Sequence, residues 1–359
     1  MKKIKCALCL TLTFALLVLA LGGCAKEEAL STTEPDQKEE NTVPADKPVE
    51  DEIEPEEAPT EVVIDNFKGQ TTYTEVPERV VSLSYSETEI LVALGLQDKI
   101  VGIAEADNSS EVVSEEYRSM VESLNVIAAT EDGGVPTLEV VLSQSPDFVY
   151  GTAYSFNSSY GVGDVADFEA NDIKIYASTS TYKSDSTIED TYNDILNIGR
   201  IFRVEDRAEE LVAEMRTKID AIAEKVANED PISVFIYDSG DSSAYTFYGN
   251  SYEGSLAALA GGENVFTENE NGGGMVGWEA VVAANPEFIV VNDWGGGEGA
   301  APIEEKINFI KAQPELQEVT AVKEDNFVVV HLEQASFGGL QNTVAVETIA
   351  KALHPGCFE

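Results

Sequence analysis

One segment of the chain occurs twice, without a gap, at a constant offset of 140 residues. Residues 138–149 align with residues 278–289, and each copy reads as a short helix, a turn of Pro and an acidic residue, and a buried strand. Internal repetition indicates a repeated structural unit. We therefore expect two similar α/β lobes with a cleft between them; the alternative is a chance alignment of common α/β turns. The identical pairs are Glu139 and Glu279, Val141 and Val281, Pro146 and Pro286, and Phe148 and Phe288.

Short apolar strands alternate with helical stretches from residue 62 onward. A hairpin is predicted over 62–76 with Gly69 in its turn, and Ser86 with Glu89 forms a capping-box pattern that predicts a helix over 87–94. This alternation indicates an α/β fold with mainly parallel sheets. The predicted architecture is two Rossmann-like lobes joined by a long rigid helix, with a ligand cleft between the lobes. The further strands are predicted at 80–83, 100–103, 148–150, 173–176, 233–237, 288–291 and 327–330.

A long amphipathic helix is predicted near the middle of the chain, over 206–227, with Asp206 as its N-cap. Its apolar residues recur every three or four positions, which places them on one face. An ordinary core helix would show the same stripe, but the position between two α/β sets favours a helix that joins two lobes. The predicted parts are an N-terminal lobe (62–205), a connecting helix (206–230) and a C-terminal lobe (231–359). The stripe consists of Ala208, Leu211, Val212, Met215, Ile219, Ile222 and Val226.

The N-terminal end, residues 1–23, reads as a lipoprotein signal peptide. Lysines precede an apolar run that is short for a bilayer span, and the run ends in Leu-Gly-Gly-Cys24, which resembles the bacterial lipobox. Cys24 would carry lipid and hold the secreted chain on the outer face of the bacterial cytoplasmic membrane; an ordinary signal peptide or a transmembrane anchor is the alternative. Residues 24–61 are acidic, rich in Pro and free of aromatic residues, which predicts a disordered tether. Only Cys357 is left for the folded part, so no disulfide framework is expected.

The formal net charge is −44, from 22 Lys and Arg against 66 Asp and Glu. A surface of that sign repels nucleic acid and anionic lipid headgroups, so we expect no nucleic-acid partner and membrane contact only through the lipid. His331 and His354 are the only histidines, and no Cys cluster accompanies them. We therefore expect no site for a bare transition-metal ion.

Glu139 and Glu279 occupy the same place in the two copies of the repeat, in the first turn of a short helix, and Thr137 is a candidate N-cap before the first of them. An acid at that place is stabilised by the helix dipole, by about 0.3–1 kcal/mol, whether or not it has a function. A matched pair on two lobes also suits a partner that is itself a symmetric dimer.

Five stretches, 77–83, 88–95, 138–149, 261–266 and 278–290, are individually weak signals but specific in this order and spacing. Together they resemble the solute-binding lipoproteins of ABC importers for iron-siderophore complexes, haem and cobalamin, a family with two α/β lobes joined by a rigid helix. The resemblance implies a binding protein rather than an enzyme, a permease dimer with its ATPase as partner, and a metal chelate as transported ligand with no permanent cofactor. It also implies that the two glutamates of the repeat dock into arginine pockets of the permease, a charge-assisted pairing.

The ligand of such a protein is expected where the carboxyl ends of the strands of both lobes face each other. The loops predicted there are rich in aromatic residues, which suit a wide, flat ligand; the alternative is that these rings pack the loops. No Arg follows Arg216, and acids lie near the rim, so the cleft favours a corrinoid or another neutral or cationic chelate over an anionic catecholate. The candidate ligand-binding residues are Tyr85, Ser86, Tyr154, Phe156, Tyr182, Asp238, Tyr245, Tyr248, Trp278, Trp294 and Phe337.

Two other classes of function stay open at this point, an extracellular two-lobed α/β enzyme and a surface adhesin-type lipoprotein. The many acids could pair for glycoside chemistry. However, the sequence has no G-x-S-x-G, HExxH or P-loop pattern. For a binding protein, a stiff helical joint predicts only small lobe motion.

Overall fold

The computed structural model describes residues 61–104, 112–128, 134–295 and 302–359. They belong to one compact unit, Glu57–Glu359. The strands are β1 (Val62–Asn66), β2 (Gly69–Tyr73), β3 (Val80–Ser82), β4 (Ile100–Ala104), β5 (Val126–Ala128), β6 (Phe148–Gly151), β7 (Lys174–Ala177), β8 (Ile232–Tyr237), β9 (Ala244–Phe247), β10 (Gly262–Asn264), β11 (Gly273–Val276), β12 (Phe288–Asp293) and β13 (Phe327–His331). The α-helices are α1 (Tyr85–Ala93), α2 (Glu115–Val121), α3 (Leu138–Ser143), α4 (Val165–Glu169), α5 (Ile188–Phe202), α6 (Glu205–Val226), α7 (Tyr252–Leu259), α8 (Trp278–Ala284), α9 (Ile303–Ala312), α10 (Thr320–Lys323), α11 (Leu332–Ser336) and α12 (Asn342–Leu353).

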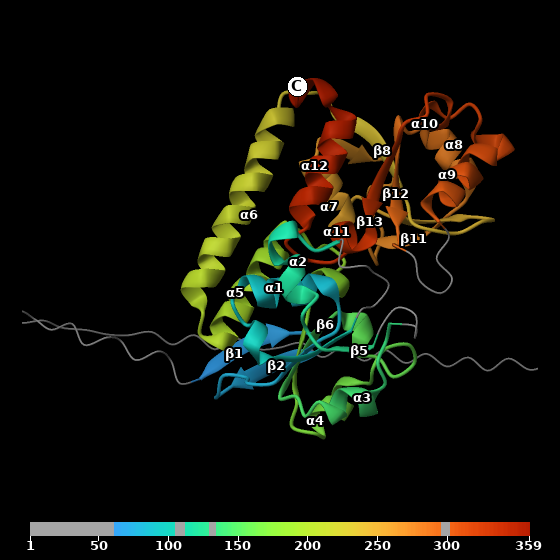
Figure 1. Cartoon of the computed structure of the whole chain (residues 1–359). Helices are drawn as coiled ribbons and strands as arrows, with labels where there is room; N and C mark the ends of the chain where they lie inside the picture. The colour runs from blue at the N-terminus through green and yellow to red at the C-terminus, as the bar shows by residue number, and fades with distance from the viewer. Residues whose placement is uncertain (1–60, 105–111, 129–133, 296–301) are drawn as a thin grey trace, which may run out of the picture. The chain divides into compact units, whose positions relative to one another are not determined.

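Two parallel sheets organise the described chain (Figure 1). A five-stranded sheet has the order β5-β4-β3-β6-β7, and a four-stranded sheet has the order β10-β8-β12-β13. Their central strands are continuous apolar runs, as expected for strands covered on both faces; Val80, Val149 and Val290 are fully buried. We call the part from β1 to α5 the first half and the part from β8 to α12 the second half. The predicted α/β fold with mainly parallel sheets is confirmed, whereas the boundaries of the lobes at 205 and 230 stay predictions.

The two copies of the repeat form the same structure, α3 with β6 and α8 with β12, and these strands hold equivalent places in the two sheets. A left-handed residue follows each helix, Ser145 (φ 52°) two positions after the end of α3 and Asn285 (φ 47°) directly after α8. The acid of the following turn then accepts a backbone N–H bond at the start of the neighbouring strand. Asp147 accepts from the N–H of Arg79 at 3.0 Å, and Glu287 accepts from the N–H of Ser233 at 3.0 Å. The Pro-acid pattern therefore has a structural cause in both halves.

Helix α6 lies in the sequence between the two halves and packs against α5 of the first half and α7 and α12 of the second (Figure 1). Every apolar residue of its predicted stripe is buried. The helix begins at Glu205 with Val204 as its N-cap, so Asp206 lies in the first turn rather than at the cap. The cause is Arg203, whose left-handed conformation (φ 58°) ends α5 and lets the chain turn directly into α6.

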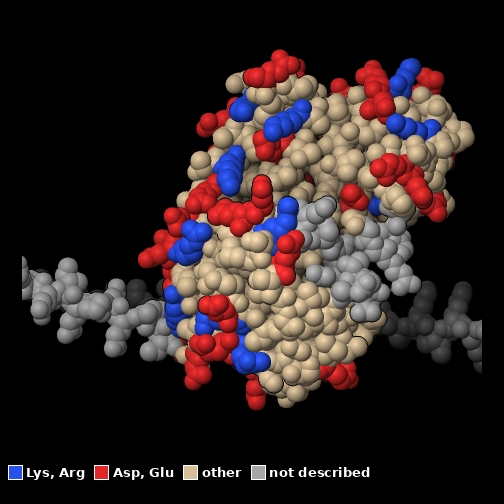
Figure 2. Space-filling model, in the orientation of Figure 1, with Lys and Arg blue, Asp and Glu red and all other residues tan. Residues whose placement is uncertain are grey.

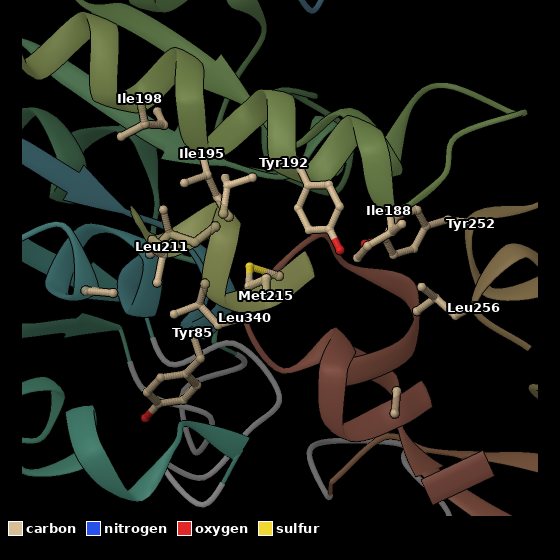
Figure 3. Close-up of a cluster of buried hydrophobic side chains, with 14 of the residues drawn as sticks. Tyr85, Ile188, Tyr192, Ile195, Ile198, Leu211, Met215, Tyr252, Leu256 and Leu340 are labelled. Atoms are coloured by element: carbon tan, nitrogen blue, oxygen red, sulfur yellow. The ribbon is translucent and has the colours of Figure 1, made fainter. Parts of the chain in front are cut away.

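The largest hydrophobic cluster is continuous between the two halves. Figure 3 shows Tyr192 and Ile195 of α5 lying toward Leu211 and Met215 of α6, with Leu256 of α7 nearby. The cluster also contains β-strand residues from both parallel sheets. One shared core therefore joins the sheets, in addition to the chain connection through α6.

Three local predictions differ from the structure. Ser86 and Glu89 form no capping box, because α1 begins at Tyr85 and the Glu89 carboxylate instead accepts bonds from the Ser114 N–H and the Gln341 side chain, both at 2.8 Å. In the hairpin, Gly69 pairs with Asn66 as the first residue of β2, so the turn lies one step earlier. The strands β5, β9, β10 and β11 were not predicted.

Charged side chains are spread over the face shown in Figure 2, where Asp and Glu predominate. Lys and Arg lie among them, and a broad area over the first half carries neither kind. The seven described salt bridges are at the surface, where such pairs contribute little, about 0–1 kcal/mol each. The fold is therefore held by its core rather than by ion pairs.

Candidate ligand-binding site

Two adjoining pockets lie where strands of both sheets end. The larger has a volume of about 570 Å³ and the smaller about 200 Å³. Their walls include Thr152 after β6, Asp238 after β8 and Trp294 after β12, so the carboxyl ends of strands from both sheets meet at this site. That edge is where α/β sheets bind ligands. The two pockets share Tyr154, Trp294, Leu332 and Phe337.

Exposed tyrosine rings line the pockets on the side of the first half. Tyr154 is 55 % exposed, Tyr160 63 % and Tyr182 38 %. Although the rings are partly exposed, desolvation by the surrounding protein raises the pKa of the Tyr154 and Tyr182 hydroxyls, so both remain neutral hydrogen-bonding groups. Large apolar surfaces gathered in a concave site are typical of ligand contact. Tyr160 was not predicted, because it lies well beyond the end of its strand.

Asp238 is held in a buried polar network below the rim in the second half. Its Oδ1 accepts from the Trp294 indole Nε1 at 3.0 Å, and its Oδ2 accepts from the Ser239 hydroxyl at 2.9 Å. The Lys306 Nζ donates to the backbone carbonyls of Asp238, at 3.0 Å, and Asn292, at 2.7 Å, and lies 4.8 Å from the Trp294 ring centroid. Burial lowers the pKa of Lys306. The network fixes the orientation of Trp294 on the pocket wall.

Glu253, in the first turn of α7, also lines the larger pocket and is only 1 % exposed. Its Oε2 accepts from the Ser336 hydroxyl at 2.9 Å and from the Asn292 side-chain amide at 3.1 Å. Desolvation raises its pKa to about 8. Sequence reasoning missed this residue, although one signal was available: Glu87 occupies the matching first turn of α1, 166 residues earlier, and is also buried.

Six of the predicted ligand-binding residues line the larger pocket, and three of these also line the smaller one. Loops of the first half provide two of them, and the other four belong to the second half. Their contact with a ligand stays a prediction. These residues are Tyr154, Tyr182, Asp238, Tyr245, Trp294 and Phe337.

Five predicted residues line neither of these two pockets, and their contact with a ligand also stays a prediction. Tyr85 is part of the main core, and the hydroxyl of Ser86 donates to Glu333 at 3.5 Å. Phe156 packs edge-on against a neighbouring phenyl ring, and the ring of Tyr248 also packs against a Phe. Trp278 is 4 % exposed, and its indole donates to a backbone carbonyl. These rings pack the loops and core, which was the alternative reading of the aromatic residues.

Glu139 and Glu279 are both exposed in the first turns of α3 and α8. The Thr137 hydroxyl accepts from the Val140 N–H at 3.4 Å, which confirms the predicted N-cap. Gly277 caps α8 without a side chain. The structure thus presents one acid on each half, at equivalent places.

Cys24 and almost all of the predicted tether lie outside the described residues, as does the signal segment. Within the described ranges, no helix has the length and apolar character needed to cross a membrane. The same part of the chain holds no cluster of three or more His, Cys, Asp or Glu side chains suited to a metal ion.

Two parallel sheets with a ring-lined pocket at their carboxyl ends are the arrangement expected of an α/β protein that binds a small molecule. The model for the family described as periplasmic binding protein matches residues 80–333, which is more than half of the chain. The chain therefore belongs to the periplasmic binding protein family.

Relatives of known sequence and structure agree with this assignment. The uncharacterized ABC transporter substrate-binding lipoprotein YvrC of Bacillus subtilis is 27% identical over 307 residues, covering 83% of this chain and 87% of that protein. A vitamin B12-binding protein of Vibrio campbellii is 24% identical over 212 residues, covering 59% of this chain and 70% of that protein. Both relatives are named as binding proteins, the first for a substrate of an ABC transporter and the second for vitamin B12.

Solved structures share the fold. A periplasmic binding protein from Veillonella parvula superposes with a TM-score of 0.74 at 29% identity, covering 83% of this chain and 99% of that one. A protein of an ABC-type Fe3+-hydroxamate transport system from Saccharomonospora viridis gives a TM-score of 0.69 at 22% identity, covering 82% of this chain and 99% of that one. The second likeness shows the fold alone.

Proposed function

We propose that this chain is the lipid-anchored substrate-binding component of an ABC importer and that its ligand is a metal chelate, either an iron complex with a siderophore or haem, or a corrinoid. The observation that carries the proposal is the pair of ring-lined pockets at the strand ends of two repeated sheets, in a chain whose relatives are substrate-binding proteins. Cys24 provides the anchor on the outer face of the cytoplasmic membrane, and the importer's permease dimer and ATPase are the partners.

The charge of the pockets supports a neutral or cationic ligand. The larger pocket is lined by the acids Asp238 and Glu270 and by one cation, Lys183, while a third acid, Glu253, has a pKa raised to about 8 and adds little charge at pH 7. The ammonium of Lys183 is paired with Asp190 at 2.9 Å, so it is not available to neutralise an anionic ligand. A neutral corrinoid or ferric hydroxamate therefore fits the lining better than a ferric catecholate.

The two tryptophans of the chain provide a sharp binding assay. Trp294 lines both pockets, whereas Trp278 is buried outside them. Cobalamin, ferrichrome, haem and a ferric catecholate are titrated against the full chain while tryptophan fluorescence is followed. We expect quenching by cobalamin or ferrichrome that persists in Trp278→Phe and is lost in Trp294→Phe. Tightest binding of the catecholate would overturn the charge argument, and no response to any of the four ligands would overturn the proposed function.

A further inference from the structure

Glu253 lines the larger pocket, and one oxygen of its buried carboxyl group takes no part in the described hydrogen bonds. Its Oε2 takes both described hydrogen bonds, from Ser336 and Asn292. Its Oε1 is buried and has no hydrogen-bond partner within the described part of the chain. A buried polar atom without a partner costs about 1–3 kcal/mol. Because the residue lines a pocket, a bound molecule is in a position to remove that cost.

The two bonds to Oε2 also decide which oxygen carries a proton. An oxygen that accepts from two donors acts as the carbonyl oxygen of a neutral carboxyl group, so the proton resides on Oε1. Burial raises the pKa of Glu253 to about 8, which keeps the group largely neutral at pH 7. At that pH Oε1 is a hydrogen-bond donor rather than an acceptor.

We propose that Glu253 is a ligand-recognition residue whose Oε1 donates a hydrogen bond to an uncharged acceptor oxygen of the ligand, such as an amide or hydroxamate carbonyl. This inference rests on the proposed function and narrows its ligand class. Asp238 is 6 % exposed and shares the Asn292 amide with Glu253. A carboxylate group of a ligand at this place would lie close to the Asp238 carboxylate, and the two like charges would repel each other. The site therefore selects chelates with neutral oxygen groups on their periphery.

Several charged or titratable groups lie on the elements around the larger pocket, and one of them, Asp238, acts on the ionisation of Glu253. Asp238 further raises the pKa of Glu253, and the buried Lys306 amine lies behind Asp238. The wall and rim of the larger pocket add an acid and a paired cation, and α11 and the end of β13 add two more groups. These are Glu270, Lys183, Glu333 and His331.

Substitutions at Glu253 test the inference, with the equivalent glutamate of the first half as a matched control. Glu253→Gln places an amide N–H donor where Oε1 lies, and Glu253→Ala removes the donor. Glu87→Gln changes a glutamate that is equally buried in the same turn of α1, but Glu87 lines neither pocket. Dissociation constants for cobalamin and ferrichrome are measured with the full chain by calorimetry between pH 6 and 9.5.

We expect wild-type affinity to fall roughly tenfold as the pH rises through about 8, because the ionised carboxyl group donates no bond. Glu253→Gln should bind with nearly wild-type affinity at pH 6 and lose the pH dependence, Glu253→Ala should bind roughly tenfold more weakly at pH 6, and Glu87→Gln should match the wild type. An unaltered pH profile in Glu253→Gln overturns the inference even if Glu253→Ala fails to fold. Binding of neither ligand by the wild type, with haem and the catecholate also failing, overturns the proposed function itself.

Discussion

Three buried carboxyl groups make the stability of this protein depend on pH at the scale of single residues. Desolvation raises the pKa of Glu87 to about 7, of Asp194 to about 7 and of Glu253 to about 8. Between the ordinary values near 4 and these raised values, the native state binds more protons than the unfolded chain. Stability contributed by these groups is therefore complete below about pH 4 and is lost as the pH rises toward 8.

We predict that the free energy of unfolding is larger at pH 5.5 than at pH 8.5, and that Glu87→Gln reduces this difference, since the amide cannot ionise. Urea unfolding at the two pH values measures both quantities. The Ser178 hydroxyl that donates to Glu87 at 2.6 Å keeps an acceptor in the variant, so the native network survives the change. Equal pH dependence in variant and wild type would show that Glu87 titrates normally.

The sequence could not predict which individual residues line the pockets and which fill the core. The aromatic residues near the strand ends were found as a group, but Tyr154 and Trp294 line the pockets whereas Phe156 and Trp278 fill the core. Their sequence contexts are alike, and only tertiary packing separates them. Glu253 was missed because an acid is rarely fully buried, so its type argues against burial.

At the scale of elements, α6 owes its stability to the stripe that it buries between helices of the two halves. Ile219 is 2 % exposed, so we predict that Ile219→Ala lowers the free energy of unfolding by about 2–5 kcal/mol. The exposed Glu209 on the same helix supplies the control, and Glu209→Ala should change stability by less than about 0.5 kcal/mol. Denaturant unfolding measures both. Similar losses of unfolding free energy in the two variants would mean that burial of the apolar stripe does not stabilise the helix.

The elements that could be predicted from the sequence are those whose own apolar residues form a clear pattern. The stripe of α6 and the apolar runs of β6 and β12 are local signals, so their existence follows from the residues in them. Strands β5 and β11 have three and four residues and include exposed or glycine positions. Such short strands form because a partner strand lies beside them, which no local pattern reveals.

At the scale of the whole molecule, the matched acids on α3 and α8 carry the proposed docking to the permease. We predict that Glu139→Ala combined with Glu279→Ala leaves the dissociation constant for ligand nearly unchanged, because neither residue lines either of the two pockets described above, and abolishes uptake in cells. Glu169→Ala combined with Glu268→Ala, at two other exposed acids, is the control and should keep uptake. Normal uptake by the first double variant would discard the docking assignment.

The repeat allowed the two-sheet plan to be predicted from sequence, because the helix, turn and strand recur with the same turn conformation and the same acid-to-backbone bond. The fifth strand of the first sheet has no counterpart in the second. The offset between matching residues accordingly changes from 166 at Glu87 to 140 at Glu139. Resemblance between the halves is thus confined to four strands and the helices beside them.

The hydrophobic cluster that runs without interruption between the halves limits how this molecule can work. Moving the two halves apart would expose apolar side chains of α5, α6 and α7 to water. That exposure costs a free energy of about 25 cal/mol for every Å² of apolar surface. Ligand binding should therefore leave the hydrodynamic radius of the protein almost constant. Under the proposed function, release of the ligand is then driven by the transporter. Its rate is set by ATP hydrolysis and not by spontaneous opening of the binding protein.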